Sequence, residues 1–192
     1  MRVFTAQRGA DTPDELWVLE HPPVYTLGLG ADPAHGPNYS LHGEAAAIPI
    51  LRVERGGEIT YHGPGQVIVY TLVDLARRDL KVREFVCLLE QSVIDVLAVH
   101  GVAAVRKPGA PGVYVDGAKV AALGLRVTRG RAFHGLALNV DMELAPFAAI
   151  DPCGHPGLLV TRTRDLGVAA PPAALGGALA ERIAVLMEQS HA

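Results

Sequence analysis

Short apolar runs bounded by glycine, proline or polar residues occur through the first part of the chain. Runs of this length predict strands. We expect strands over residues 15–20, 24–27, 48–53 and 67–73. Between the first two lies His21-Pro22-Pro23, where a corner is expected because proline fixes φ and restricts the residue before it. Residues 28–44 show no periodicity and are expected to form a long loop.

The pattern becomes helical in two later segments, where apolar residues recur at spacings of three and four. They are Val82, Phe85, Val86, Leu89, Val93, Val96 and Leu97 in the first segment, and Leu175, Leu179, Ile183 and Leu186 in the second. We expect helices over residues 83–99, ended by Gly101, and 173–189. Cys87 lies inside the first helix and is interpreted as a small buried hydrophobic residue.

Between the two helices the sequence predicts an antiparallel meander. Apolar runs occupy residues 113–115, 118–127 and 132–140, and they are joined by Asp116-Gly117 and Arg129-Gly130, dipeptides typical of tight hairpins. Strands that follow one another this way argue against a βαβ repeat. We therefore expect one α+β domain over residues 1–192, with mixed, mostly antiparallel sheets flanked by helices.

Composition and charge exclude several classes of protein. The chain has 192 residues, of which 49% are hydrophobic and 19% charged, and its net charge of −3 does not indicate nucleic-acid binding. No apolar run approaches the ~20 residues that cross a bilayer, and the first residues lack the apolar core of a signal peptide. We expect a cytoplasmic protein with no membrane or nucleic-acid partner. The two cysteines have no zinc-binding spacing, and no metal is expected.

A glycine-rich stretch between two apolar runs is the first candidate for a binding site. Its four glycines let the main chain pass close to a ligand, and the flanking runs are expected to be buried strands that hold it. The stretch contains neither G-x-x-x-x-G-K-[ST] nor G-x-G-x-x-G, so a phosphate-binding loop is not indicated. A glycine-rich hairpin turn is the alternative. Its residues are Arg55, Gly56, Gly57, Glu58, Ile59, Thr60, Tyr61, His62, Gly63, Pro64, Gly65 and Gln66.

Cys153 is the second candidate, because it lies in a loop between Pro152 and Gly154, where a thiol is open to approach. Only a few per cent of an ordinary thiol with a pKa near 8.5 is ionised at neutral pH, so a nucleophilic cysteine needs a neighbouring base. Lys119 is one candidate, since it opens the most apolar strand, where burial would lower its pKa. His155 is a rival base. A solvated Lys119 and an incidental loop cysteine remain the alternatives.

Two stretches of small residues complete the set of candidates. Ala122-Leu123-Gly124 and Gly135-Leu136-Ala137 are expected on neighbouring strands, where they would leave either a groove for an aliphatic chain or a tightly packed sheet. His134, just before the second stretch, is interpreted as a hydrogen-bonded structural residue.

These segments together resemble the octanoyltransferases of lipoate biosynthesis. The resemblance covers residues 16–166. It rests on five stretches in the same order, namely residues 20–28 (EHPPVYTLG), 55–66 (RGGEITYHGPGQ), 119–127 (KVAALGLRV), 133–140 (FHGLALNV) and 152–154 (PCG). It implies a fold like that of lipoate and biotin protein ligases.

The resemblance also implies an activity and roles for residues. The family transfers an octanoyl group from acyl carrier protein to a lysine of lipoyl domains, those of 2-oxoacid dehydrogenase complexes and the glycine-cleavage H protein, through a cysteine thioester and without cofactor. Cys153 would be the nucleophile, and Lys119 would lower its pKa. The acyl site would be lined by Arg55, Gly56, Gly57, Glu58, Ile59, Thr60, Tyr61, His62, Ala122, Leu123, Gly124, Gly135, Leu136 and Ala137, with His21 nearby.

Three further expectations accompany this resemblance. An ATP-dependent lipoate ligase and a non-catalytic acyl-binding module remain alternatives. The strand and helix that usually precede the Glu-His-Pro motif are expected to be missing or shortened. Because both protein partners are typically acidic, a basic rim is expected from Arg77, Arg78, Lys81, Arg126, Arg129 and Arg131.

Overall fold

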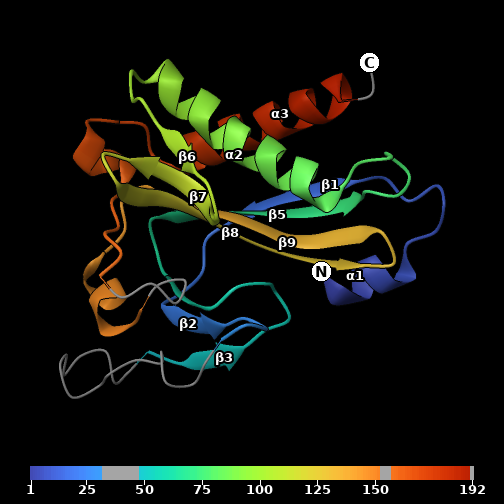
Figure 1. The fold of residues 1–192 in the computed structure, drawn as a ribbon, viewed down its shortest axis with the longest axis horizontal. Coiled ribbons are helices and arrows are strands. Elements are labelled where there is room, and N and C mark those ends of the chain that lie inside the picture. The colour runs from blue at the N-terminus through green and yellow to red at the C-terminus, as the bar shows by residue number, and fades with distance from the viewer. Residues whose placement is uncertain (32–47, 152–156, 191–192) are drawn as a thin grey trace.

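A computed structural model describes residues 1–31, 48–151 and 157–190. Figure 1 shows two long helices over one face of a central sheet and a smaller sheet beyond the other face. The central sheet has the strand order β1-β5-β9-β8-β7-β6, and the smaller one has the order β3-β2-β4. All pairs in the central sheet are antiparallel, whereas β2 pairs parallel with β3 and antiparallel with β4. The predicted α+β class with mixed sheets is confirmed.

The strands and helices have the following bounds. The central sheet contains β1 (Glu15–Leu19), β5 (Gln66–Asp74), β6 (Val105–Lys107), β7 (Ala110–Val115), β8 (Ala118–Thr128) and β9 (Arg131–Asn139), and the smaller sheet contains β2 (Val24–Leu27), β3 (Ile50–Arg52) and β4 (Ile59–His62). The helices are α1 (Arg2–Gln7), α2 (Val82–Val99) and α3 (Pro172–Gln189), with short 3₁₀ turns η3 (Ala145–Ala149) and η5 (Thr163–Leu166).

The meander predicted from the sequence is present, and its turns follow from residue type. Asp116 and Gly117 have φ of 48° and 87°, and Arg129 and Gly130 have φ of 52° and 76°. Two successive positive φ angles are those of the hairpin turn that Asp-Gly favours, so this prediction is confirmed.

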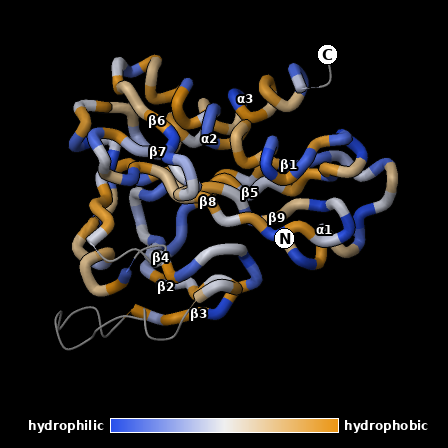
Figure 2. The backbone as a smooth tube through the Cα atoms, in the orientation of Figure 1, coloured by the Kyte–Doolittle hydropathy of each residue, from blue (hydrophilic) through white to orange (hydrophobic). Residues whose placement is uncertain are grey.

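The main hydrophobic core lies between the helices and the central sheet, and a second cluster lies under the smaller sheet. The main core joins Phe85, Leu89 and Val93 of α2 to Leu179 of α3 and to Val69 of the sheet. The second cluster consists of Tyr25, Ile59, Tyr61, Met142, Phe147 and Ile150. Figure 2 shows apolar residues in runs along the strands and recurring between polar residues along α2 and α3.

Three expectations about local structure are wrong. The stretch from Arg55 to Gln66 is not a loop throughout, because Ile59–His62 forms β4 and pairs with β2. The run before it is not buried, because Ile50 and Leu51 of the edge strand β3 are 39% and 54% exposed. Cys87 is exposed. At about 100° per residue it lies roughly 200° around the helix from the buried Phe85.

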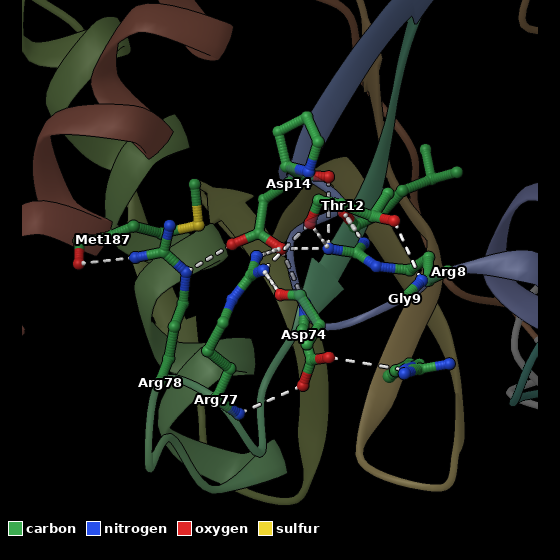
Figure 3. A network of polar contacts seen from close by, with 12 residues as sticks. Arg8, Gly9, Thr12, Asp14, Asp74, Arg77, Arg78 and Met187 are labelled. Atoms are coloured by element: carbon green, nitrogen blue, oxygen red, sulfur yellow. Dashed lines mark hydrogen bonds and ion pairs between the residues drawn. The ribbon is translucent and has the colours of Figure 1, made fainter.

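An ion-pair cluster fastens the amino-terminal segment to the rest of the domain (Figure 3). The carboxylate of Asp14 accepts hydrogen bonds from Arg8, Arg77 and Arg78 and from the Asp74 amide. The side chain of Arg8 is fully buried. Burial alone would raise the pKa of Asp14, but these hydrogen bonds outweigh it and hold that pKa below its usual value.

This cluster also changes the predicted basic rim. Arg77 and Arg78 pair with Asp14, and Arg131 pairs with Asp74, so half of the expected rim is engaged within the domain. Lys81, Arg126 and Arg129 are exposed.

Candidate active site

A cavity of about 580 Å³ opens between the central sheet and the smaller sheet. Its volume is within the range of small-molecule sites. Its walls come from β2, β3, β4, β5, β8 and β9, from the start of α2, and from Gly109 and the start of β7. Of the residues expected to line an acyl site, the cavity brings together Arg55, Gly56, Gly57, Glu58, Ile59, Thr60, His62, Ala122, Leu123, Gly124, Gly135, Leu136, Ala137 and His21, and Lys119 lies on the same wall.

Tyr61 is the expected lining residue that lies elsewhere. Side chains alternate along β4, and Tyr61 points into the second hydrophobic cluster, where it is 4% exposed and packs edge-on against Phe147. Tyr61 therefore packs against the smaller sheet as part of this cluster and does not line the cavity.

The small residues of β8 and β9 make room for Arg55 and for close strand packing. Gly124 is opposite Gly135 across the two strands. A Cβ on Gly124 would lie 3.0 Å from Cδ of Arg55, and one on Gly135 would lie 2.0 Å from the carbonyl oxygen of Val69. The structure therefore contains both predicted alternatives, because these stretches line a cavity and also allow the strands to pack closely.

Arg55 connects the two sheets at the cavity wall. Its guanidinium donates to the carbonyl and hydroxyl oxygens of Thr26 at 2.6 and 2.9 Å and to the carbonyl of Gly56 at 3.0 Å. The Gly56 amide in turn donates to Leu125 of β8 at 2.9 Å. The fixed fork of the guanidinium thereby places a permanent positive charge beside the cavity.

Three histidines on the cavity wall are held uncharged at neutral pH. Burial lowers the pKa of His62 to about 4, and burial together with the charge of Arg55 lowers the pKa of His134 to about 4. Burial also lowers the pKa of His21, whose Nε2 lies 2.5 Å from the Tyr70 hydroxyl. The cavity therefore presents neutral imidazoles to a ligand.

The tautomer of His62 is fixed by a chain of amides. Gln66 donates from Nε2 to Oδ1 of Asn139 at 2.8 Å, and Asn139 donates from Nδ2 to the carbonyl of Thr161 at 2.9 Å. The remaining oxygen of Gln66 must then accept from His62 Nδ1, at 2.7 Å. His62 therefore carries its proton on Nδ1 and keeps a lone pair on Nε2.

Lys119 is 4% exposed, so the alternative of a solvated lysine at this position is wrong. Its Nζ donates to the carbonyl of Pro111 at 3.2 Å and lies 5.3 Å from the ring centre of Tyr114. These partners satisfy a lysine amine that burial removes from water.

The main chain of Lys119 holds the segment that follows the predicted cysteine loop. Its amide donates to the carbonyl of Leu159 at 2.8 Å, and its carbonyl accepts from the amide of Thr161 at 3.0 Å. These two bonds form an isolated parallel β-bridge between Lys119 and Val160. Cys153 and His155 themselves lie outside the described residues, as does most of the long loop expected after Gly28.

Sequence reasoning did not assign Tyr70, Thr26 or His134 to the cavity wall, nor Val82 and Val86. Tyr70 and His134 are partly exposed between buried neighbours on β5 and β9, and neither strand has an alternating pattern from which their side of the sheet could have been predicted. Val82 and Val86 belong to the apolar face of α2, and nothing in the spacing separates a cavity-facing residue from a core residue.

Among the described residues, no group of His, Cys, Asp and Glu could hold a metal ion, and no helix is long and apolar enough to cross a membrane.

Residues 1–166 match the family described as the lipoyl protein ligase A/B catalytic domain. The chain belongs to this family. Within it, the octanoyltransferase of Aromatoleum aromaticum is 60% identical over 176 residues, which are 92% of this chain and 74% of that protein. The resemblance drawn from the five motifs is confirmed.

Two solved structures share the fold at low sequence identity. A bi-partite lipoate protein ligase from Thermoplasma acidophilum superposes with a TM-score of 0.79 at 14% identity, over 97% of this chain and 76% of that one. A biotin protein ligase from Aquifex aeolicus gives 0.53 at 16% identity, over 65% and 54%. The predicted likeness to lipoate and biotin ligases is confirmed for the fold.

Proposed function

We propose that this family member is an octanoyltransferase that moves an octanoyl group from acyl carrier protein to a lysine of a lipoyl domain in the cytoplasm. The high identity to a relative named octanoyltransferase supports the class of reaction. The observation that carries the proposal is Lys119, buried on the wall of a cavity lined by aliphatic residues and hydrogen-bonded through its main chain to residues 159–161, which follow the Cys153 loop.

The reaction proceeds in two transfers. The amine of Lys119 takes the proton of the Cys153 thiol, and the thiolate attacks the thioester carbonyl of the carrier. The bond from carbonyl carbon to carrier sulfur breaks, and the carrier thiol leaves with the proton from Lys119. The lysine of the lipoyl domain then attacks the acyl-enzyme, the Cys153 sulfur leaves, and the amine proton returns through Lys119 to the thiol.

Raising the thiolate population from a few per cent to most of the molecules accelerates attack by tens-fold at most, or roughly 2 kcal/mol. Most of the acceleration therefore comes from positioning of the acyl chain and from stabilisation of the oxyanion. Val24, Ile68 and Ala137, which line the cavity and belong to neither hydrophobic cluster, provide apolar contacts for the chain. The neutral histidines allow these contacts without adding a further charge to that of Arg55.

Intact mass measurement after incubation with octanoyl-acyl carrier protein tests the proposal. The chain has two cysteines, and Cys87 is exposed on α2, so Cys87→Ser is a matched control. We expect one octanoyl adduct on the wild type and on Cys87→Ser, and none on Cys153→Ser. An adduct that persists in Cys153→Ser would refute the cysteine intermediate.

The same incubation with octanoate and ATP separates a transferase from an ATP-dependent ligase. Formation of AMP would assign the chain to the ligases. A non-catalytic acyl-binding module would bind octanoyl carrier equally with and without the Cys153 thiol, and would yield no amide product on a lipoyl domain.

A further inference from the structure

Glu90 of α2 is a buried carboxylate close to Lys119 that the proposed reaction does not use. It is 5% exposed, and its Oε1 accepts a hydrogen bond of 2.8 Å from the amide of Gly112. Its Oε2 lies 3.2 Å from Nε of Arg106, which is 38% exposed. A carboxylate is costly to bury, so these two partners account for its place in the interior.

The amide that Glu90 binds belongs to the same peptide group as the carbonyl that binds Lys119. The peptide between Pro111 and Gly112 donates its N–H to Glu90 and accepts from Nζ of Lys119 with its C=O. Because a peptide group is planar and trans, fixing the direction of the N–H also fixes the direction of the C=O. Glu90 therefore determines where this carbonyl points.

The sheet does not fix this peptide group. Pro111 and Gly112 fall outside the paired registers of β7 with both β6 and β8. Gly112 has φ of 135°, and a Cβ there would lie 3.0 Å from Cε of Lys119 and 2.8 Å from the carbonyl of Ala121. The lysine side chain thus lies directly against a backbone segment whose orientation depends on a side chain from α2.

We infer that Glu90 is a positioning residue for Lys119: through the Pro111–Gly112 peptide it holds the carbonyl that anchors the amine at the cavity wall. This inference rests on the proposed role of Lys119 in acyl transfer. The interaction depends on the reach of the Glu90 oxygen rather than on its charge, because Arg106 is partly exposed and can be solvated without it.

Two conservative variants separate reach from charge. Glu90→Asp keeps the charge but shortens the side chain by one methylene, so the oxygen no longer reaches Gly112. Glu90→Gln removes the charge but keeps an oxygen at the same distance. Gln91→Ala is the matched control, since Gln91 also binds Arg106, at 2.7 Å, whereas the Gly112 amide donates to Glu90.

Lysine labelling with acetic anhydride, quantified by peptide mass spectrometry, measures the accessibility of the amine. Lys81 and Lys107 are the only other lysines and serve as internal references. Relative to Lys81, we expect labelling of Lys119 to rise about tenfold in Glu90→Asp. This is the change expected when the hydrogen bond between Glu90 and the Pro111–Gly112 peptide is lost. Glu90→Gln and Gln91→Ala should stay within about twofold of wild type on the same scale.

The rate of acyl-enzyme formation should fall in the same order, with Glu90→Asp slower than Glu90→Gln. The opposite order, or equal labelling in all variants, would overturn the inference. Should Glu90→Asp not fold, hydrogen exchange of the Gly112 amide in the wild type decides, and unprotected exchange would overturn it. Absence of an acyl adduct on wild-type Cys153 would refute the proposed function while leaving the labelling result intact.

Discussion

Gly135→Ala should weaken the central sheet at the cavity wall. The new Cβ would lie 2.0 Å from the carbonyl oxygen of Val69, 3.1 Å from its carbonyl carbon and 3.3 Å from the Thr71 amide. All three atoms are backbone atoms of β5, which pairs directly with β9 at this position. No side-chain rotation can relieve the contact, so the strands must separate by about 1.4 Å for the 2.0 Å distance to reach an ordinary contact of 3.4 Å.

The cost follows from overpacking and from weakened hydrogen bonds. Overpacking in a dense interior costs about 1–3 kcal/mol, and one or two strained inter-strand hydrogen bonds add roughly 1 kcal/mol each. We expect the free energy of unfolding to fall by about 3 kcal/mol, which for a chain of this length lowers the melting temperature by roughly 6–12 °C.

Urea unfolding followed by circular dichroism measures this change. Gly177→Ala is the matched control, because a Cβ at this position of α3 meets nothing within 4 Å. That variant should be more stable by about 0.5–1 kcal/mol through helix propensity. A Gly135→Ala protein as stable as the wild type would show that β5 and β9 are not packed at the described distance.

Three further results are expected. Gly124→Ala should displace Arg55 and weaken octanoyl binding about tenfold while costing less than roughly 2 kcal/mol of stability, because the atom nearest the new Cβ, at 3.0 Å, is Cδ of the Arg55 side chain and the nearest backbone atom is the Gly56 carbonyl oxygen at 3.2 Å. Isothermal titration measures the binding, and thermal melts measure the stability. Because the folded pKa of His62, about 4, is below the unfolded value of 6.5, the free energy of unfolding should fall by up to about 1.4 kcal/mol per pH unit as pH drops from 6.5 toward 4. In His62→Gln the urea midpoint should depend less on pH in that range. Asp14→Asn should lower stability by about 3–5 kcal/mol in urea unfolding, because the fully buried Arg8 loses its carboxylate; an unchanged midpoint would contradict the ion-pair cluster.

The sequence predicted the elements whose local chemistry and tertiary role agree. Asp116-Gly117 and Arg129-Gly130 favour hairpin turns wherever they occur, so the β7-β8-β9 meander was predictable. The face of α3 built from Leu175, Leu179 and Ile183 is long enough to define its period, and it is buried as expected.

The elements that were missed are short or depend on distant partners. The strand β6 has three exposed residues and carries no alternating pattern, whereas β3 was predicted as a strand but wrongly as a buried one. The strand β4 lies within a glycine-rich stretch and exists because β2 is beside it. The periodicity of a sequence does not show which strands lie side by side.

The site was partly predictable for the same reason. Residue types marked Lys119 and the glycine-rich stretch, but the His62–Gln66–Asn139 chain joins residues 73 positions apart and requires the β5–β9 pairing. The Glu90–Gly112 contact likewise depends on how α2 lies over β7. A single sequence does not show which side chains of the helix layer contact which residues of the sheet.

The division of the interior into two clusters has a consequence for how ligands enter. The cavity lies between a large, helix-covered core and the smaller aromatic cluster under β2 and β4. The smaller cluster has fewer buried apolar residues than the main core, so we expect the smaller sheet to open locally at a lower free energy than the helix-covered sheet. Amide exchange on β2 and β4 should therefore be faster than on β5 and β9, and an acyl chain can reach its site through a breathing motion of one wall while the helix-covered sheet stays intact.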